Sequence, residues 1–270
     1  MISRKFVRNL KGVIKLYKVL IAEDDEAVRY VYSRMKIWNE CGFQITKQVS
    51  DGKEAIDAFE SENFDLILTD IRMPWIDGIE LLKKIRESGR DIEVIFVSTY
   101  SDFEYARQGL ILGAFDYILK PVKSDKLRKV LERAKKKLDE KNYTNIAEAC
   151  VKSAFDYFNM TKESVFGEHL FGYISSLGIN VTTMEEVAES FEISKDYFGK
   201  LFKQNFGIHF NQFYSVLKIE YSKALIRNYN YKAYEISEIL GYSSRDYFTK
   251  IFREITGITP TEYKARFHIS

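Results

Sequence analysis

The sequence has only two cysteines and no apolar run long enough to span a bilayer. Cys41 and Cys150 lie far apart and lack metal-type spacing, so we expect two buried thiols in a reducing compartment. The N-terminal residues are too polar for a signal peptide. These absences favour a cytoplasmic protein with no membrane association. Its 270 residues, 46% hydrophobic and 30% charged, are enough for about two ordinary globular domains.

An excess of charge of one sign is also missing, since the net charge is only +2. Residues 165–270 carry 12 basic and 12 acidic side chains, so any nucleic-acid role there must rest on how charge is arranged. The first 17 residues carry five basic side chains and no acid. Residues 1–16 could form a basic arm or a weak membrane-surface helix. We prefer a disordered N-terminal extension or a misassigned start.

The first half alternates apolar runs with helical periods from Tyr17 to Lys137. Five strand–helix pairs in sequence predict an α/β fold, with a doubly wound, five-stranded parallel sheet and helices on both faces. The expected strands are 17–22, 43–49, 64–69, 92–98 and 116–119, and the expected helices are 26–38, 52–60, 78–88, 102–112 and 124–138.

Polar side chains follow the strands, and the carboxyl ends of parallel strands share one edge of the sheet. Clustered carboxylates there need a cation, and magnesium with oxygen ligands suits them. A lysine and a hydroxyl beside them would allow one aspartate to attack phosphorus and form an acyl phosphate. In chain order these side chains are Glu23, Asp24, Asp25, Asp70, Ser98, Thr99 and Lys120, with Pro121 after the lysine.

Three segments, "VLIAEDDEAVR", "LILTDIRMPWIDGIELL" and "FVSTYSDFEYARQGLILGAFDYILKPV", together resemble the CheY-like receiver domain of two-component response regulators, which has a flavodoxin-like fold. The resemblance covers about 120 residues. It implies Mg²⁺ as cofactor and a cis-type Pro121. The roles that it implies are phospho-acceptor for Asp70, metal binding for Glu23, Asp24, Asp70 and the Arg72 backbone carbonyl, switch residues for Ser98 and Tyr117, and phosphoryl contact for Lys120 and Ser98.

Two alternatives concern this site. The loop has three consecutive acids, so Asp24 and Asp25 could bind the metal in place of Glu23 and Asp24. We prefer the latter pair, because Asp25 then becomes a helix N-cap. Phosphatases of the dehalogenase type also use a strand-end aspartate, but they need a second aspartate where this chain has Arg72. We therefore do not expect an enzyme.

The second half contains a duplicated element, "SKDYFGKLFKQNFGI" at 194–208 and "SRDYFTKIFREITGI" at 244–258. Each copy reads as a short helix, a turn and a second helix, which is the helix-turn-helix arrangement that enters the DNA major groove. Phe198 and Phe202 recur as Phe248 and Phe252, which predicts one apolar face in each second helix. The expected helices are 164–177, 183–191, 194–206, 210–228, 233–240, 245–255 and 259–267.

The outward positions of the second helices are the expected DNA contacts. Asp196 and Asp246 could accept from cytosine, although we favour capping of their helices, and we expect Tyr197 and Tyr247 to hold the helices on the core. Where the copies differ, as at Gly199 and Thr249, they should read different bases. The expected contacts are Lys195, Asp196, Gly199, Lys200, Lys203, Arg245, Asp246, Thr249, Lys250 and Arg253.

This pattern, and "LGYSSRDYFTKIFREITGITPTEYK" above all, resembles the AraC/XylS-type DNA-binding domain. Joined to a receiver, it is similar to a YesN-like response regulator. We expect an N-terminal extension at 1–16, a receiver domain at 17–138, a partly helical linker at 139–164 and a DNA-binding domain at 165–270.

The resulting hypothesis is a transcriptional regulator controlled by phosphorylation of Asp70. The expected partners are a sensor histidine kinase, double-stranded DNA and a second copy of the chain when phosphorylated, with RNA polymerase as a further candidate. One alternative, a ligand-sensing AraC-type activator, would need a β-rich sensory domain in place of the α/β half. The other is a receiver-gated interaction module without a DNA role, which only a binding experiment distinguishes.

Overall fold

The computed structural model describes residues 16–99, 107–109, 111–178 and 182–267. The chain divides into two compact units, of which the first spans Lys15–Asp139 and the second includes Glu140–Ser270. Most of the predicted extension at 1–16 and most of the predicted helix at 102–112 lie outside the described residues. Within the described part of the chain, no helix has both the length and the apolarity that a membrane crossing requires.

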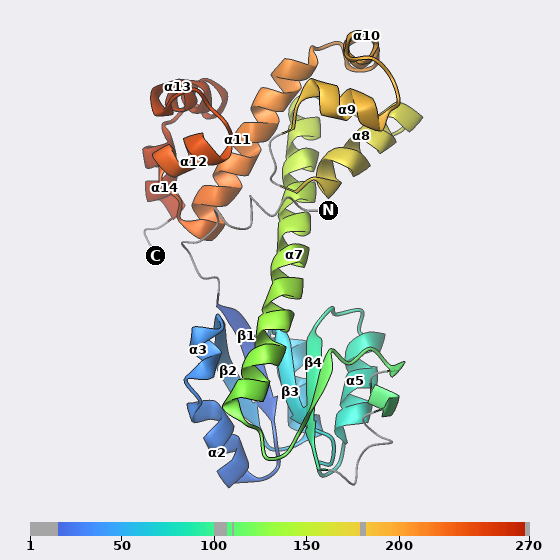
Figure 1. Cartoon of the computed structure of the whole chain (residues 1–270), viewed down its shortest axis with the longest axis vertical. Helices are drawn as coiled ribbons and strands as arrows, with labels where there is room; N and C mark the ends of the chain where they lie inside the picture. The colour runs from blue at the N-terminus through green and yellow to red at the C-terminus, as the bar shows by residue number, and fades with distance from the viewer. Residues whose placement is uncertain (1–15, 100–106, 110, 179–181, 268–270) are drawn as a thin grey trace. The chain divides into compact units, whose positions relative to one another are not determined.

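The first unit contains a five-stranded, all-parallel sheet in the order β2-β1-β3-β4-β5, which confirms the predicted fold class (Figure 1). The two central strands β3 and β4 are buried almost throughout because helices cover both faces. The strands are β1 (Tyr17–Ala22), β2 (Phe43–Val49), β3 (Leu66–Asp70), β4 (Glu93–Ser98) and β5 (Asp116–Leu119).

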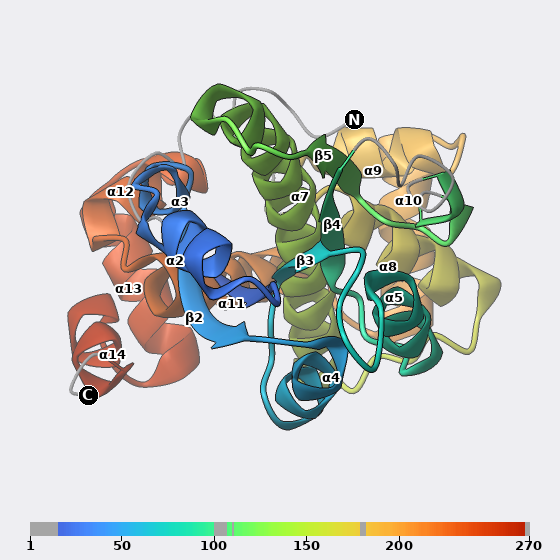
Figure 2. The same cartoon turned by 90° about the horizontal axis from the view of Figure 1, so that it is seen from below.

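Two hydrophobic clusters fill the space between the sheet and its helices, one on each face. Figure 2 shows α2 and α3 on one side of the sheet and α4 and α5 on the other. Helices α2, α3 and the first part of α7 pack on one face, and α4 and α5 pack on the other. Their bounds are α2 (Glu26–Arg34), α3 (Ile37–Glu40), α4 (Gly52–Ser61), α5 (Gly78–Glu87) and α7 (Ser124–Tyr157).

The single helix predicted at 26–38 was wrong, because the structure divides it into α2 and α3. Met35 is extended, with φ −65° and ψ 119°, and it ends α2. The break lets Trp38 enter the core, where its side chain is 2% exposed and its indole N–H donates to the Tyr32 carbonyl at 2.8 Å. Burial of this large side chain outweighs the continuation of the helix.

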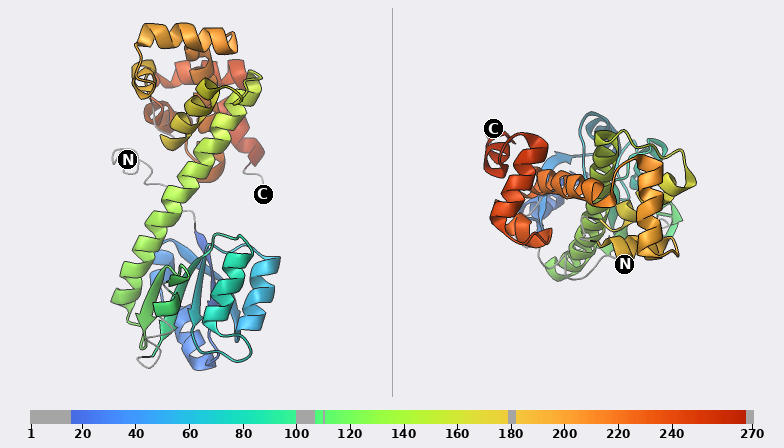
Figure 3. Two further views of the ribbon diagram at one scale, coloured as in Figure 1. Left: turned by 90° about the vertical axis from the view of Figure 1, so that its right-hand side faces the viewer. Right: turned by 90° about the horizontal axis from the view of Figure 1, so that it is seen from above.

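The second unit is entirely helical in its described residues, and α11 runs from the group α8–α10 to the group α12–α14 (Figure 3). These helices follow the predicted ranges closely, because caps and apolar periods mark their ends in the sequence. Their bounds are α8 (Val165–Ser176), α9 (Met184–Ser190), α10 (Lys195–Phe206), α11 (Phe210–Tyr229), α12 (Ala233–Ile239), α13 (Arg245–Thr256) and α14 (Pro260–Phe267).

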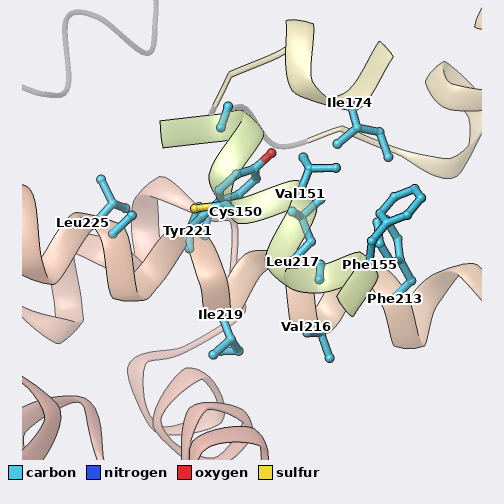
Figure 4. Packing of buried hydrophobic residues seen from close by; sticks show 14 of the residues in the cluster. Cys150, Val151, Phe155, Ile174, Phe213, Val216, Leu217, Ile219, Tyr221 and Leu225 are labelled. Carbon is cyan, nitrogen blue, oxygen red and sulfur yellow. The ribbon is translucent and has the colours of Figure 1, made fainter. Parts of the chain in front are cut away.

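Residues 140–157, predicted to be part of a linker, continue α7 and belong to the core of the second unit. Val151 and Phe155 lie beside Leu217 and Phe213 of α11 (Figure 4). The Phe155 and Phe213 rings meet edge to face with centroids 5.6 Å apart. The second unit is therefore built around the end of α7 as well as around the two repeated elements.

Candidate functional site

Three carboxylates meet where two neighbouring strands end. Ala22, the last residue of β1, pairs with Thr69 of β3, so the residues that follow each lie at the same edge of the sheet. One carboxylate oxygen from each of Glu23, Asp24 and Asp70 lies within 4.8 Å of the others. This cluster of hard oxygen donors is suited to a divalent cation.

Lys120 joins two of these carboxylates. Its Nζ donates to Asp70 Oδ2 at 2.5 Å and to Glu23 Oε1 at 2.9 Å. The lysine reaches the pocket because β5 pairs with β4, and its backbone N–H donates to the Ser98 carbonyl at 2.7 Å. The peptide bond that follows, to Pro121, is cis, as expected. Partial burial disfavours the ammonium, but the hydrogen bonds to Asp70 and Glu23 outweigh it and raise the pKa of Lys120.

Glu23 is the buried member of the cluster, with 1% of its surface exposed. Burial raises the pKa of its carboxyl to about 7, against the hydrogen bond from Lys120 and with the help of the Asp70 charge. Its Oε2 atom is buried and has no hydrogen-bond partner among the described residues. A buried, unsatisfied carboxylate oxygen beside two more carboxylates fits a bound cation, which would satisfy it.

Asp25 has a different environment from its two acidic neighbours. It is the N-cap residue of α2, and its carboxylate accepts from the backbone N–H groups of Ala27 at 2.8 Å and Val28 at 3.1 Å. The expected cap is confirmed. Because these bonds occupy Asp25 at the helix N-terminus, Glu23 and Asp24 are the acids of this loop that join Asp70.

The loop after Asp70 folds tightly against the strand end. The backbone N–H of Arg72 donates to Asp70 Oδ1 at 3.3 Å. A Cβ built on Gly78, the first residue of α5, would meet the Asp70 carbonyl oxygen at 2.3 Å. Only glycine allows α5 to begin this close to Asp70. Trp75, in the same loop, is 86% exposed.

The two predicted switch residues converge on one backbone oxygen. Ser98 is fully buried at the end of β4, and its hydroxyl donates to the Thr99 carbonyl at 3.2 Å. The Tyr117 hydroxyl, from β5, donates to the same carbonyl at 3.3 Å. Ser98 follows the residue that pairs with Asp70, so it lies at the edge of the sheet where the carboxylates gather.

In the second unit, the two repeated elements form α9–turn–α10 and α12–turn–α13. Ser194 and Ser244 are the N-caps of α10 and α13, and their hydroxyls accept from backbone N–H groups three residues on. Both helices end at a glycine with positive φ. The apolar faces are confirmed, because the following side chains are fully buried: Phe198, Phe202, Phe248 and Phe252.

The structure leaves the other face of each helix exposed or half-exposed. Some charges on it are paired with neighbours, since Lys195 Nζ lies 2.5 Å from Glu185 Oε1 and Lys250 Nζ 3.9 Å from Glu254 Oε1. Gly199 and Thr249 are half-buried. The remaining expected DNA contacts are exposed, namely Lys195, Asp196, Lys200, Lys203, Arg245, Asp246, Lys250 and Arg253.

Two expectations for these helices were wrong. Asp196 and Asp246 are not the capping residues, because the serines two positions earlier make the cap bonds. The aspartates lie in the first turn, where the helix dipole favours a negative charge. Tyr197 and Tyr247 do not hold the core, since they are 56% and 51% exposed. Their offset of one residue from the buried phenylalanines was the signal that should have placed them outward.

A groove of about 280 Å³ runs beside α10 and the start of α11. Basic side chains and Asp196 line it together with one thioether, that of Met184, which no sequence pattern singles out. Its lining includes Met184, Lys195, Gly199, Lys200, Lys203 and His209.

Comparisons with known proteins identify both units. The response regulator receiver domain family matches residues 19–132, and a helix-turn-helix domain family matches residues 187–266. An uncharacterised response regulatory protein of Staphylococcus epidermidis is 27% identical over 92% of this chain and 98% of its own. The transcriptional regulatory protein HptR of Staphylococcus aureus is also 27% identical, over the same shares.

Among solved structures, the receiver domain of AraT, a response regulator from Geobacillus stearothermophilus, is 32% identical over 47% of this chain and 98% of its own, with a TM-score of 0.45. The two family matches cover the acidic pocket and both recognition helices in one chain. The chain therefore belongs to the response regulators, with a receiver domain followed by an AraC-type helix-turn-helix domain.

Proposed function

We propose that this response regulator accepts a phosphoryl group on Asp70 from a sensor histidine kinase and regulates transcription by binding double-stranded DNA. The observation that carries the phosphorylation step is the Lys120 ammonium between Asp70 and the buried Glu23. A cation already bound to the aspartate is placed to hold the charge of an incoming phosphoryl oxygen.

Glu23, Asp24, Asp70 and the backbone carbonyl of Arg72 would hold Mg²⁺. The orphaned Glu23 Oε2 supports this assignment. When bound, the ion supplies positive charge that neutralises the carboxylates and the phosphoryl oxygens. Glu23 must lose its proton to take part, and its raised pKa makes that loss sensitive to pH near neutrality.

Asp70 is the nucleophile of the proposed reaction. Its carboxylate oxygen forms the new P–O bond while the P–N bond of the phosphohistidine breaks, and the imidazole leaves with the electron pair of that bond. Lys120 keeps its proton throughout, because its hydrogen bonds raise its pKa. The chain serves as the acceptor of one phosphoryl group, and we propose no enzymatic reaction on a separate substrate.

The switch would use the shared carbonyl of Thr99. A phosphoryl oxygen on Asp70 competes for the Ser98 hydroxyl, which now donates to that carbonyl. Tyr117, which donates to the same atom, would then move with it. This is a local charge change that selects between two arrangements of one surface.

The output would be DNA binding by α10 and α13, each in a major groove. Two helices in one chain can read two successive groove segments, and a phosphorylation-dependent homodimer would present four. We expect the kinase, DNA and a second copy as partners, RNA polymerase as a further one, and the cytoplasm as the location. The transcriptional role of the Staphylococcus aureus relative agrees with this proposal.

Acetyl phosphate with Mg²⁺ tests the phosphorylation step in the full chain. We expect an added mass of one phosphoryl group in wild type and in the control Asp57→Asn, whose aspartate lies exposed on α4. Asp70→Asn should stay unmodified. Labelling of Asp70→Asn would overturn the assignment of the acceptor.

Gel-shift titration of random duplex at two salt concentrations tests the DNA step separately. We expect binding at low salt that weakens steeply as salt rises. Absence of binding at low salt, in both phosphorylated and unphosphorylated protein, would overturn the DNA role and leave the receiver-gated interaction module as the function.

A further inference from the structure

One of the differences between the two helix-turn-helix elements, α9–turn–α10 and α12–turn–α13, lies on the candidate DNA surface. Gly199 of α10 corresponds to Thr249 of α13, and both are half-buried. A Cβ built on Gly199 would lie 2.6 Å from the Cε atom of Met184, which belongs to α9. The thioether therefore occupies the space that a side chain at position 199 would fill.

The second helix-turn-helix element, α12–turn–α13, has the opposite arrangement. In α9 and α12, the N-cap backbone N–H donates to the glutamate three residues on, from Thr183 to Glu186 at 2.9 Å and from Lys232 to Glu235 at 2.7 Å. Aligning these caps sets Met184 opposite Ala233. The first element, α9–turn–α10, thus combines a large residue on its first helix with glycine on its second helix. The second element, α12–turn–α13, combines alanine with threonine.

Both arrangements present an apolar group. The Thr249 hydroxyl donates to the Arg245 carbonyl at 2.9 Å, so its one donor is used within α13 and its methyl group remains for other contacts. In the first helix-turn-helix element, Met184 lines the same groove as Lys195, Lys200 and Lys203. Its apolar end therefore lies among the side chains proposed to contact DNA.

We propose that Met184, on α9, is part of the DNA-reading surface. It supplies to the first helix-turn-helix element the apolar contact that Thr249 supplies to the second element. Its target is the 5-methyl group of a thymine, the apolar feature that a T·A pair presents in the major groove. The inference rests on the proposed DNA binding. It changes the earlier expectation for Gly199, whose missing side chain leaves room for Met184.

Substitution of thymine by deoxyuridine tests the contact, because it removes only the 5-methyl group. A duplex selected from random DNA by the full wild-type chain would be altered at one thymine at a time, and binding measured by gel shift. We expect at least one thymine in each half of the site whose replacement weakens binding about fourfold, the effect of one buried methyl group.

Variants assign each thymine to a residue. Met184→Leu keeps an apolar end and should still bind the thymine duplex about fourfold more tightly than the deoxyuridine duplex. Met184→Gln should bind the two duplexes equally when they differ at the thymine that residue 184 contacts. In the second helix-turn-helix element, Thr249→Val should keep the difference in affinity between the thymine and deoxyuridine duplexes at another thymine. Thr249→Ser, which lacks the methyl group, should lose that difference. Thermal unfolding of each variant confirms that the chain is folded.

Three results have separate meanings. Failure of the wild type to bind any duplex would overturn the proposed DNA role and this inference with it. Specific binding with wild-type thymine ratios in a folded Met184→Gln variant would overturn the inference alone. Loss of the ratio in Met184→Gln but not in Met184→Leu, at a thymine that Thr249→Ser leaves unaffected, would support it.

Discussion

Lys120 Nζ donates to Glu23 Oε1 at 2.9 Å, although 97 positions separate the two residues in the sequence. The same nitrogen donates to Asp70, so one ammonium holds two acids whose charges would otherwise repel. The Lys120–Glu23 pair links the end of β5 to the end of β1. The acidic pocket therefore depends on a residue that follows the last strand of the sheet.

Lys120→Met should destabilise the metal-free protein by about 1–3 kcal/mol, because it leaves two carboxylates without their charged donor. Added Mg²⁺ should recover more stability in the variant than in wild type, since the ion would replace the lost charge. Urea unfolding with and without Mg²⁺ measures both effects. The control is Lys47→Met, which removes an exposed pair with Glu62 at 3.3 Å and should have little effect. Equal Mg²⁺ responses in wild type and Lys120→Met would contradict a cation site here.

Glu23 makes the stability of the metal-free protein depend on pH. Its pKa is raised from 4.5 to about 7, so the folded state binds the proton more tightly than the unfolded chain. Stability from this group is therefore highest below pH 4.5 and falls as pH rises through 7. Glu23→Gln cannot ionise and should lose less stability than wild type between pH 5 and pH 8.

Urea unfolding at the two pH values, with a chelator present, makes this comparison. Glu26→Gln, at an exposed position on α2, is the matched control and should follow wild type. A Glu23→Gln variant that loses as much stability as wild type would show that another group causes the pH dependence.

Gly78→Ala should perturb the backbone that carries Asp70. Its Cβ would meet the Asp70 carbonyl oxygen at 2.3 Å, so the strand end or the start of α5 must move. We expect a loss of about 1–3 kcal/mol on unfolding and a lower rate of labelling by acetyl phosphate. Gly172→Ala is the control, because a Cβ there meets nothing within 4 Å and helix propensity favours alanine. Normal labelling of Gly78→Ala would contradict this close packing.

The sequence predicted the α/β order of the first unit and most helix ends, because periodicity, caps and turn glycines are local signals. The partners of Glu23 were foreseeable, since parallel strand ends converge. Long-range packing was not. The break at Met35 follows from burial of Trp38, and residues 140–157 are helical because they pack against α11. The contact between Met184 and Gly199 likewise exists only in the folded chain, and no local signal in the sequence indicates it.

Tyr197 and Phe198 are neighbours in α10 with different environments. Tyr197 is 56% exposed and Phe198 is fully buried. Tyr197→Ser should change the free energy of unfolding by no more than about 0.5 kcal/mol, whereas Phe198→Ala should cost about 3–5 kcal/mol. Chemical denaturation measures both. Large destabilisation by Tyr197→Ser would restore the core role that the exposure of this ring contradicts.

Lys200 tests whether the basic groove beside α10 meets the DNA backbone. If this lysine neutralises one phosphate, Lys200→Gln should weaken binding to every duplex and reduce the slope of log K against log salt by about one. Lys152→Gln removes another exposed lysine, on α7, that does not line the groove, and its slope should equal that of wild type. Gel shifts at four salt concentrations determine each slope. An unchanged slope in Lys200→Gln would exclude a phosphate contact at this lysine. A sequence-dependent loss with an unchanged slope would assign it to a base edge instead.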